Sequence, residues 1–276
     1  MLNLISDSSC DLRAFELSGP QVRLQVIPMH LHIDHKDFPD DENLNLREML
    51  EAIAKAPSST ACPSPQAFAD AFAQGDESIC VTISSPLSGT YQAAVTGREL
   101  ALAEDPERKI FVLDSRSTAG GMALLLRKAA ALYEAGRPFE EICDILTTYR
   151  DNLRTCFTLM SFHNLVQAGR MKPITGALLQ TLGIHVIAQA TPEGSISVAG
   201  KARGEVKTYQ AIVEQMKKSK NCRGAEVIVS HCENLVGAVR LKEHILKELP
   251  VRSVEIRSCR GLTGYYAMEG GLILAY

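Results

Sequence analysis

The sequence predicts an α/β fold in which the first half forms a parallel sheet with crossover helices. In that half, short apolar segments alternate with helical segments, as in chains that build parallel sheets. Polar turns rich in Ser and Asp follow two of the apolar segments, at residues 6–9 and 114–117. The chain has 276 residues, 46% of them hydrophobic, which is enough for one large or two medium domains.

The elements of the first half follow from apolar runs and helix caps. Leu2 to Ile5 is predicted as a buried strand, and Val22 to Ile33 as strand segments broken at a proline. Asn45 and Ser64 are expected to cap helices that begin at the next residue. The helices and later strands expected here are, in order, helix 46–54, helix 65–72, strand 79–83, helix 91–103, strand 110–113 and helix 121–135.

The second half mixes strands and helices in a less regular order, so we place a boundary near residues 150–158. We predict two domains, residues 1–155 and residues 156–276. The expected elements are helix 139–152, strand 155–159, helix 165–169, an apolar stretch 174–182, strands 184–189 and 195–199, helix 205–218, strand 226–230, helix 235–247, strand 253–258 and a last strand near 270–274.

Composition excludes several classes of protein. Lys and Arg total 29 and Asp and Glu total 32, a formal charge of −3, and Trp is absent, so we expect no nucleic-acid binding. No apolar run reaches the roughly 18 residues of a membrane-spanning helix. The start of the chain has no basic segment before an apolar one, so we expect no signal peptide. The eight cysteines form no CxxC pair, which favours reduced thiols in a bacterial cytoplasm.

One segment contains the residue types of a metal site: His30, His32, Asp34 and His35. This HxHxDH pattern is the one by which metallo-β-lactamase-type hydrolases hold two metal ions, and imidazole and carboxylate suit zinc or iron. Such enzymes need further ligands downstream, yet the next histidine is His163. Read as a strand, the segment places alternate polar residues on one face. We therefore predict a solvated edge strand without metal, with a metallohydrolase as the alternative.

The strongest candidate site is a hydroxyl-rich loop, Thr82 to Tyr91, between a strand and a helix. Backbone N–H groups at a helix start attract an anion, Ser88 adds a hydroxyl donor, and Gly89 allows a close backbone approach. The alternative is that Ser88 or Thr90 only caps the helix. A second hydroxyl-rich turn, Ser58 to Pro65, precedes another helix. In a doubly wound sheet both turns would lie at the carboxyl edge, where ligands bind.

Several motifs, in order along nearly the whole chain, resemble those of the DegV family. Residues 60–65 (TACPSP) are similar to the family's TSQPSP, and residues 83–94 (ISSPLSGTYQAA) to SSxLSGTYQSA. The other matches are residues 6–12 (SDSSCDL) with DSxxDL, residues 113–117 (LDSRS) with DS(K/R), and residues 165–171 (LVQAGRM) with LxxGGRI.

The resemblance implies a fold and a ligand. It implies a three-layer α/β/α domain with a parallel sheet and a two-layer α/β domain with a mixed sheet. Members of the family bind a long-chain fatty acid in a tunnel between these domains, and some present it to an ATP-dependent fatty-acid kinase. By position, Thr60 and Ser88 match the residues whose hydroxyls hold the carboxylate, and Arg170 matches a nearby cation. A carboxylate among such donors would be well satisfied.

The chain departs from the family pattern in two segments. Ala61 and Cys62 replace a serine and a glutamine. Near the end of the chain, Tyr266 stands where the family's GxHxGPGAL segment has histidine, and Met268-Glu269-Gly270 replaces GPG. A phenol donates a hydrogen bond but is not cationic at neutral pH. Glu269 would add a negative charge if it pointed inward, so presentation to a kinase is less secure than binding.

The prediction is therefore a cytoplasmic fatty-acid-binding protein with no catalytic residues and no cofactor. The fatty acid is its ligand, and Thr60, Ser88, Gly89, Arg170 and Tyr266 are the candidate site. A fatty-acid kinase subunit is the implied partner. The rivals are the metallohydrolase and a phosphotransfer subunit resembling relatives of dihydroxyacetone kinase. The second rival needs a phosphate or nucleotide loop, and the sequence shows no Walker A or GxGxxG motif.

Overall fold

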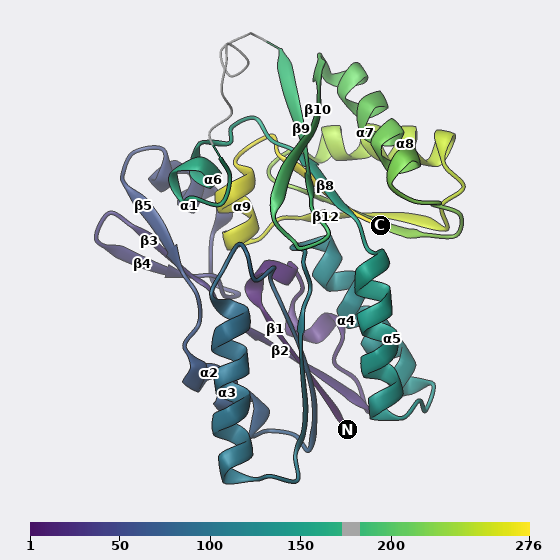
Figure 1. Ribbon diagram of the computed structural model, residues 1–276. Coiled ribbons are helices and arrows are strands. Elements are labelled where there is room, and N and C mark those ends of the chain that lie inside the picture. The colour runs from purple at the N-terminus through teal and green to yellow at the C-terminus, as the bar shows by residue number, and fades with distance from the viewer. Residues whose placement is uncertain (173–182) are drawn as a thin grey trace.

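The computed structural model describes residues 1–172 and 183–276 and has a mixed α/β architecture with three sheets (Figure 1). The apolar stretch 174–182 lies outside the described residues. The first sheet is four-stranded and parallel, in the order β2-β1-β6-β7. Its strands in that order are Val22–Ile27, Leu2–Asp7, Glu77–Thr82 and Lys109–Asp114.

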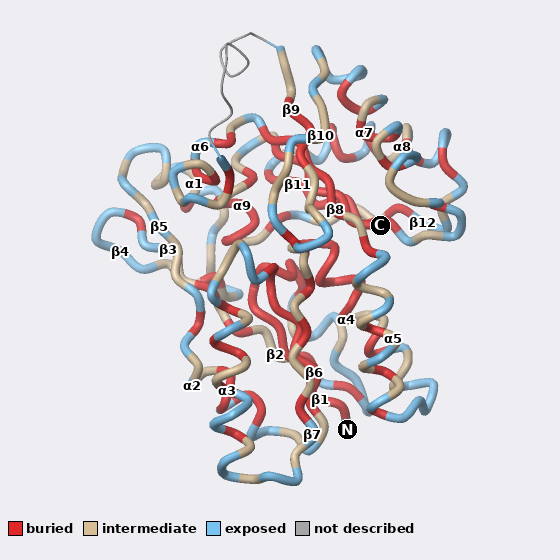
Figure 2. Tube along the Cα trace, in the orientation of Figure 1, coloured by how far each residue is buried: buried red, intermediate tan, exposed pale blue. Residues whose placement is uncertain are grey.

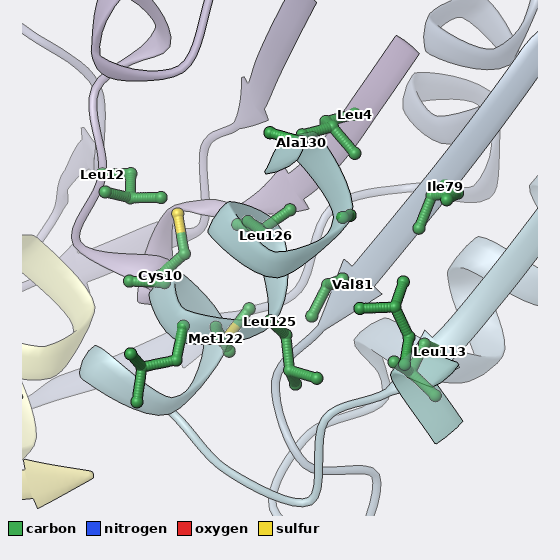
Figure 3. Packing of buried hydrophobic residues seen from close by; sticks show 14 of the residues in the cluster. Leu4, Cys10, Leu12, Ile79, Val81, Leu113, Met122, Leu125, Leu126 and Ala130 are labelled. Carbon is green, nitrogen blue, oxygen red and sulfur yellow. The ribbon is translucent and has the colours of Figure 1, made fainter. Parts of the chain in front are cut away.

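Helices cover both faces of the first sheet, which makes the predicted three layers. One face holds Leu4, Ile79 and Val81 against α4 (Gly120–Glu134), and α5 (Phe139–Asn152) packs on α4 (Figure 3). On the other face, Ile5 and Cys80 pack under α2 (Pro65–Phe72) and α3 (Thr90–Glu104). The strands are therefore buried from both sides, as the red segments at the centre of Figure 2 show.

The second sheet is six-stranded and mixed, in the order β10-β9-β8-β13-β11-β12. Only β11 and β12 pair in parallel; the other neighbours are antiparallel. Its strands in that order are Ile196–Arg203, Ile184–Ala190, Thr155–Thr158, Leu272–Ala275, Glu226–His231 and Ser253–Ser258.

The two faces of the second sheet have different neighbours. One face, with Cys156 and Val229, packs on α7 (Glu205–Ser219) and α8 (Leu235–Glu248), which gives the predicted two layers. The opposite face carries Phe157, Val186 and Ile273 in a separate apolar cluster, with residues of α6 (His163–Gln167) and α9 (Gly261–Ala267). This second face looks toward the first half of the chain (Figure 1).

A small antiparallel sheet, β4-β3-β5, lies beside these layers and corrects two expectations. Its strands are Lys36–Pro39, His30–Ile33 and Ser58–Ala61. β3 is the central strand of this sheet, so the expected edge strand is wrong. The residues of β5 are predicted as part of a turn at the edge of the parallel sheet, but they form a strand that pairs with β3. The expected caps are confirmed: Asn45 and Ser64 accept backbone N–H bonds at the starts of α1 (Leu46–Ile53) and α2.

The two halves of the chain share one core. Ile228 of β11, Leu262 of α9 and Ala275 of β13 belong to the same apolar cluster as the residues under α4. The contact is close at Gly120, where an added Cβ would lie 2.7 Å from Ile228. No larger residue fits there without displacing β11. The division at residues 155 and 156 stays a prediction.

A cavity between the two sheets

A cavity of about 300 Å³ lies between the carboxyl edge of the first sheet and the inner face of the second. That volume is at the lower end of the range for small-molecule sites. Most of its lining is apolar: Met29 and Ile83 come from the first half, and Phe157, Leu159 and Ile273 come from the second. This lining suits an apolar ligand better than a polar one.

All five residues of the predicted site, Thr60, Ser88, Gly89, Arg170 and Tyr266, line this cavity. They come from the end of β5, the β6–α3 loop, the segment after α6, and α9. Thr60 Oγ1 and the Tyr266 hydroxyl lie 3.0 Å apart, within hydrogen-bond distance. The structure thus brings together segments more than 200 residues apart and places two hydroxyl donors side by side.

The β6–α3 loop supplies further donors at the same end. Ser88 Oγ and Thr90 Oγ1 lie 2.8 Å apart, and the Thr90 N–H reaches Ser88 Oγ at 3.4 Å. Gly89 is the residue before the first turn of α3 and, as a glycine, has no side chain to cap it. The backbone N–H groups at the start of a 15-residue helix carry partial positive charge and attract anions. Ser88 therefore contributes to the cap only weakly and keeps acceptor and donor capacity toward the cavity.

Arg170 supplies the positive charge at this end. Its Nε donates to the Leu87 carbonyl at 3.0 Å, and Nη1 donates to the Ala168 carbonyl. These carbonyl partners fix the side chain without neutralising the guanidinium, so the charge remains available to a carboxylate. Leu87 also lines the cavity, so the bond holds Arg170 against the loop that carries Ser88.

Helix α9, which carries Tyr266, is held by polar groups from distant segments. Asp40 accepts N–H bonds from Gly261 and Leu262, both at 2.8 Å. Asn164 of α6 donates to the Tyr265 carbonyl at 2.7 Å. Burial raises the pKa of Asp40, while the hydrogen bonds to α9 and nearby Arg260 oppose that rise. These contacts fix the helix and so fix the phenol that faces Thr60.

Two of the departures from the family pattern, Cys62 and Glu269, lie in different places. Cys62 lines the cavity, and a Cβ added to Gly89 would lie 3.5 Å from its Sγ. Cys62 is also exposed, which places the thiol at the mouth of the polar end. Glu269 is exposed and borders a separate surface depression with Glu205 and Glu233. The condition under which Glu269 would oppose a ligand, that its side chain points inward, is therefore not met.

The histidine segment lies on the β3–β4 hairpin, and its histidines do not line the cavity. His30 Nδ1 and His32 Nδ1 lie 2.8 and 3.3 Å from Asp37, which is on the opposite strand. Asp34 occupies the turn with a φ of 55°, and His35 is exposed beside it. Over residues 1–172 and 183–276, no group of three or more His, Cys, Asp or Glu side chains is placed to hold a metal ion.

The sequence does not indicate the apolar residues that line the cavity or the polar contacts that hold α9. Phe157, Leu159 and Ile273 look like ordinary core residues, and only the stacking of the two sheets opens their face to a cavity. Asp40 and Asn164 carry no local signal, because their partners are more than 100 residues away. In the described parts of the chain, no helix combines the length and apolar surface needed to cross a membrane.

The fold and the cavity define a class: an α/β protein with a parallel sheet and a mixed sheet, and between them a largely apolar cavity with hydroxyl groups and one arginine gathered on its lining. A family model described as "Uncharacterised protein, DegV family" matches residues 1–275. A DegV domain-containing protein of Streptococcus pyogenes serotype M1 is 31% identical over 275 residues, which cover 99% of this chain and 98% of that protein. The chain belongs to the DegV family.

Two solved structures are similar over the full length. A DegV family protein from Eubacterium eligens loaded with heptadecanoic acid is 32% identical, with a TM-score of 0.93; the match covers 100% of this chain and 99% of that one. The Streptococcus pneumoniae Fatty Acid Kinase (Fak) B3 protein loaded with linoleic acid is 30% identical, with a TM-score of 0.95; the match covers 100% of this chain and 98% of that one.

Proposed function

We propose that this chain binds one long-chain fatty acid in the cavity, with the carboxylate held by Thr60, Ser88, Gly89, Arg170 and Tyr266. The observation that supports this most directly is that five residues from four segments gather at one end of one apolar cavity. An acyl chain buried there gains roughly 0.8 kcal/mol per CH₂ before entropy costs. The carboxylate gains charge-assisted hydrogen bonds from the hydroxyls and the guanidinium.

The relatives support the same ligand class, because the similar structures hold heptadecanoic and linoleic acid. The function proposed is lipid binding without catalysis by this chain, and the cytoplasm is the proposed location. The boundary between the domains is proposed at residues 155 and 156, just where β8 begins, so the ligand would lie between the domains.

A kinase partner is the second part of the proposal. Ser88, Gly89 and Arg170 border both the cavity and an open outer depression, which is also lined by Ser85, Tyr91 and Gln92. A carboxylate held by these residues would face a phosphoryl donor that enters from the outer side. The Fak B3 protein carries the name of a fatty-acid kinase, and its 30% identity supports the same kind of partner here.

The first test identifies the ligand and measures one hydrogen bond. Mass spectrometry of an organic extract of the purified protein should detect a long-chain fatty acid. Ser88→Ala removes one donor from a charged acceptor, so palmitate binding measured by calorimetry should weaken by about 1.5–3 kcal/mol.

Ser85→Ala is the matched control, because Ser85 lies in the same loop, donates to Asp114 at 2.6 Å and does not line the cavity. It should leave palmitate binding unchanged. Equal binding by the parent and Ser88→Ala would contradict the assignment of Ser88, and absence of palmitate binding by the parent would contradict the proposed function itself.

A further inference from the structure

A depression of about 240 Å³, separate from the carboxylate site, lies where the end of α5 meets the start of β8 (Figure 1). Three arginines line it: Arg116 of the β7–α4 loop, Arg150 in the last turn of α5, and Arg154 just before β8. We call it the arginine depression. Arg150 and Arg154 do not line the cavity, and none of the three arginines belongs to the proposed carboxylate site.

The three guanidinium groups of the arginine depression converge on one residue, Asp151. Arg116 Nη1 and Arg150 Nη2 lie 3.1 and 2.9 Å from the same oxygen, Asp151 Oδ1. Arg154 Nη1 donates to the Asp151 carbonyl at 2.8 Å and has no carboxylate partner within the described residues. Like charges held this close repel one another unless an anion lies between them. The lining residues therefore carry three positive charges against one negative charge.

Neighbouring groups offset this excess only in part. The carbonyls at the end of α5 contribute about half a negative charge. Asp114 and Glu193 lie near Arg116 but do not line the depression. Lys220 adds a positive charge on the other side of the balance, since its Nζ bonds the carbonyl of the last residue of α5 at 3.1 Å. Burial lowers the pKa of Lys220, and the charge of Arg154 acts in the same direction. A positive excess remains.

This arrangement suits a phosphate group better than a carboxylate. A guanidinium presents paired donors that match the oxygens of a phosphate, and three such groups offer more donors than the two oxygens of one carboxylate accept. A phosphate monoester carries about −1.5 to −2 charge near pH 7, twice the charge of a carboxylate at most. The side chain of Arg116 is 38% exposed and that of Arg150 only 12%, so the charges extend from the surface into the protein.

We propose that the arginine depression binds a phosphate monoester through Arg116, Arg150 and Arg154. The proposal goes beyond the proposed function and does not depend on it. Two sources carry this chemistry, a soluble phosphate ester and the headgroup of an anionic lipid, phosphatidic acid.

The first test is calorimetry of the full chain with inorganic phosphate, at an ionic strength held constant with chloride. The parent is expected to bind phosphate at millimolar concentrations or below. Arg154→Gln removes one guanidinium and should weaken binding about tenfold. Arg116→Gln lies in a different segment and should have the same effect, so the test does not depend on the folding of one variant.

Arg137→Gln is the matched control. It removes the same charge just before α5, where Arg137 pairs with Glu141 at 3.0 Å on the surface and does not line the depression. It should bind phosphate as the parent does. Sedimentation with phosphatidylcholine vesicles, with and without phosphatidic acid, then separates the two sources. Sedimentation that requires phosphatidic acid and is competed by inorganic phosphate assigns the lipid headgroup, whereas phosphate binding without sedimentation assigns a soluble ester.

Two results would overturn the proposal. One is a parent that binds neither inorganic phosphate nor vesicles with phosphatidic acid. The other is phosphate binding by Arg154→Gln and Arg116→Gln that is as tight as binding by Arg137→Gln. Palmitate binding by Arg154→Gln should equal that of the parent, because Arg154 does not line the cavity. Failure of this inference therefore leaves the proposed function standing, and only loss of palmitate binding by the parent contradicts that function.

Discussion

At the residue scale, the phenol of Tyr266 is the feature that most distinguishes this chain from the family motif. It lies 3.0 Å from Thr60 Oγ1 and forms an edge-to-face pair with Tyr265, whose ring centroid is 4.9 Å away. Tyr265 in turn bonds Ser58 at 3.1 Å. Two tyrosines of α9 are therefore tied to two hydroxyl residues of β5, which fixes the position of the phenol at the polar end of the cavity.

We predict that Tyr266→His improves presentation of the fatty acid to a kinase. The imidazole can carry a positive charge near neutral pH and so offset a developing acyl phosphate, whereas the phenol stays neutral. The measurement is acyl-phosphate formation with loaded protein, a DegV-type kinase subunit and ATP. Tyr266→Phe is the control, because it keeps the ring and removes only the hydroxyl. Equally rapid reactions of the parent and Tyr266→His would show that a histidine is not needed.

Cys62 offers an independent measure of occupancy. Cys62 is the exposed cysteine of the chain; the other seven are buried or half-buried. A thiol reagent should therefore modify it first, since access controls the rate. Saturating palmitate should slow that modification, because Cys62 lines the cavity beside Gly89. Cys62→Ser should lack the rapid phase. If palmitate binds but the rate of modification does not change, the carboxylate end lies elsewhere.

The candidate residues could be predicted from the sequence because each stands in a short local motif. Ser88 and Gly89 follow a strand and precede a helix, and Thr60 precedes a capped helix start. The partner atoms could not be predicted in the same way. The bond between Thr60 and Tyr266 joins residues 206 positions apart, and nothing local to either residue indicates it.

At the scale of elements, the helices and strands that the sequence predicts correctly are those marked by a helix cap, a proline or an apolar run. The cap at Ser64 with Pro65 as the first helical residue gave the start of α2 correctly. Helix α9 was missed, because its seven residues include Gly261 and Gly264, and glycine is a poor helix former. Both glycines fit crowded places: an added Cβ would lie 2.3 Å from Leu44 at Gly261 and 2.5 Å from Leu46 at Gly264. Close packing, not helix propensity, selects this element.

Buried carboxylates at the start of α9 make the stability of the protein depend on pH. Asp11 Oδ1 accepts hydrogen bonds from the Arg260 N–H at 2.9 Å and from the Thr263 hydroxyl at 2.6 Å. Its Oδ2 is buried and has no hydrogen-bond partner within the described residues. Burial raises the pKa of Asp11 to about 7, although the bonds from Thr263 and Arg260 and the charge of Arg257 oppose the rise.

The sign of the effect follows from proton binding. In the unfolded chain the pKa of Asp is near 3.9. Between about pH 4 and pH 7 the folded state therefore keeps a proton that the unfolded state has lost, so the free energy of unfolding falls as the pH rises. Below about pH 4 the effect vanishes, and above about pH 7 it is complete. The shift of about three pKa units corresponds to roughly 4 kcal/mol at most.

We predict that Asp11→Asn weakens this dependence. Asn retains an acceptor for Arg260 and Thr263, and it tolerates the left-handed conformation of this residue, whose φ is 56°. Melting temperatures from pH 4 to pH 8 should fall less steeply in Asp11→Asn than in the parent. Asp7, whose pKa burial raises to about 6, contributes a slope of the same sign in both proteins. Parallel curves for the two proteins would contradict the role of Asp11.

At the scale of the whole molecule, the ligand cavity exists only because the two sheets are locked together. The β9–β10 turn of the second sheet reaches the first half, where Ser84 Oγ donates to the Gly194 carbonyl at 2.8 Å. Gly194 and Arg116 both line the cavity, so this contact lies at the cavity wall. The sequence predicted two structural units, but the contact between them depends on side chains that carry no local signal.

Gly194 allows a direct test of this contact. Its φ is +91°, and an added Cβ would lie 2.1 Å from Ser84 Oγ and 2.9 Å from the Arg116 Cα. Gly194→Ala therefore combines an unfavourable backbone conformation with a collision against a backbone atom. We predict that it weakens the docking of the turn, lowers the melting temperature, and speeds the release of a bound fatty acid.

Gly136→Ala separates backbone strain from docking. Gly136 also has a positive φ, +75°, but an added Cβ there would meet no atom within 4 Å. It should therefore cost only the backbone term, about 1–2 kcal/mol, and leave ligand release as in the parent. Dissociation of a fluorescent fatty acid and thermal unfolding should be measured for all three proteins. If Gly194→Ala and Gly136→Ala release the fatty acid at the same rate, the turn does not close the cavity, and the ligand leaves through the polar end beside Cys62.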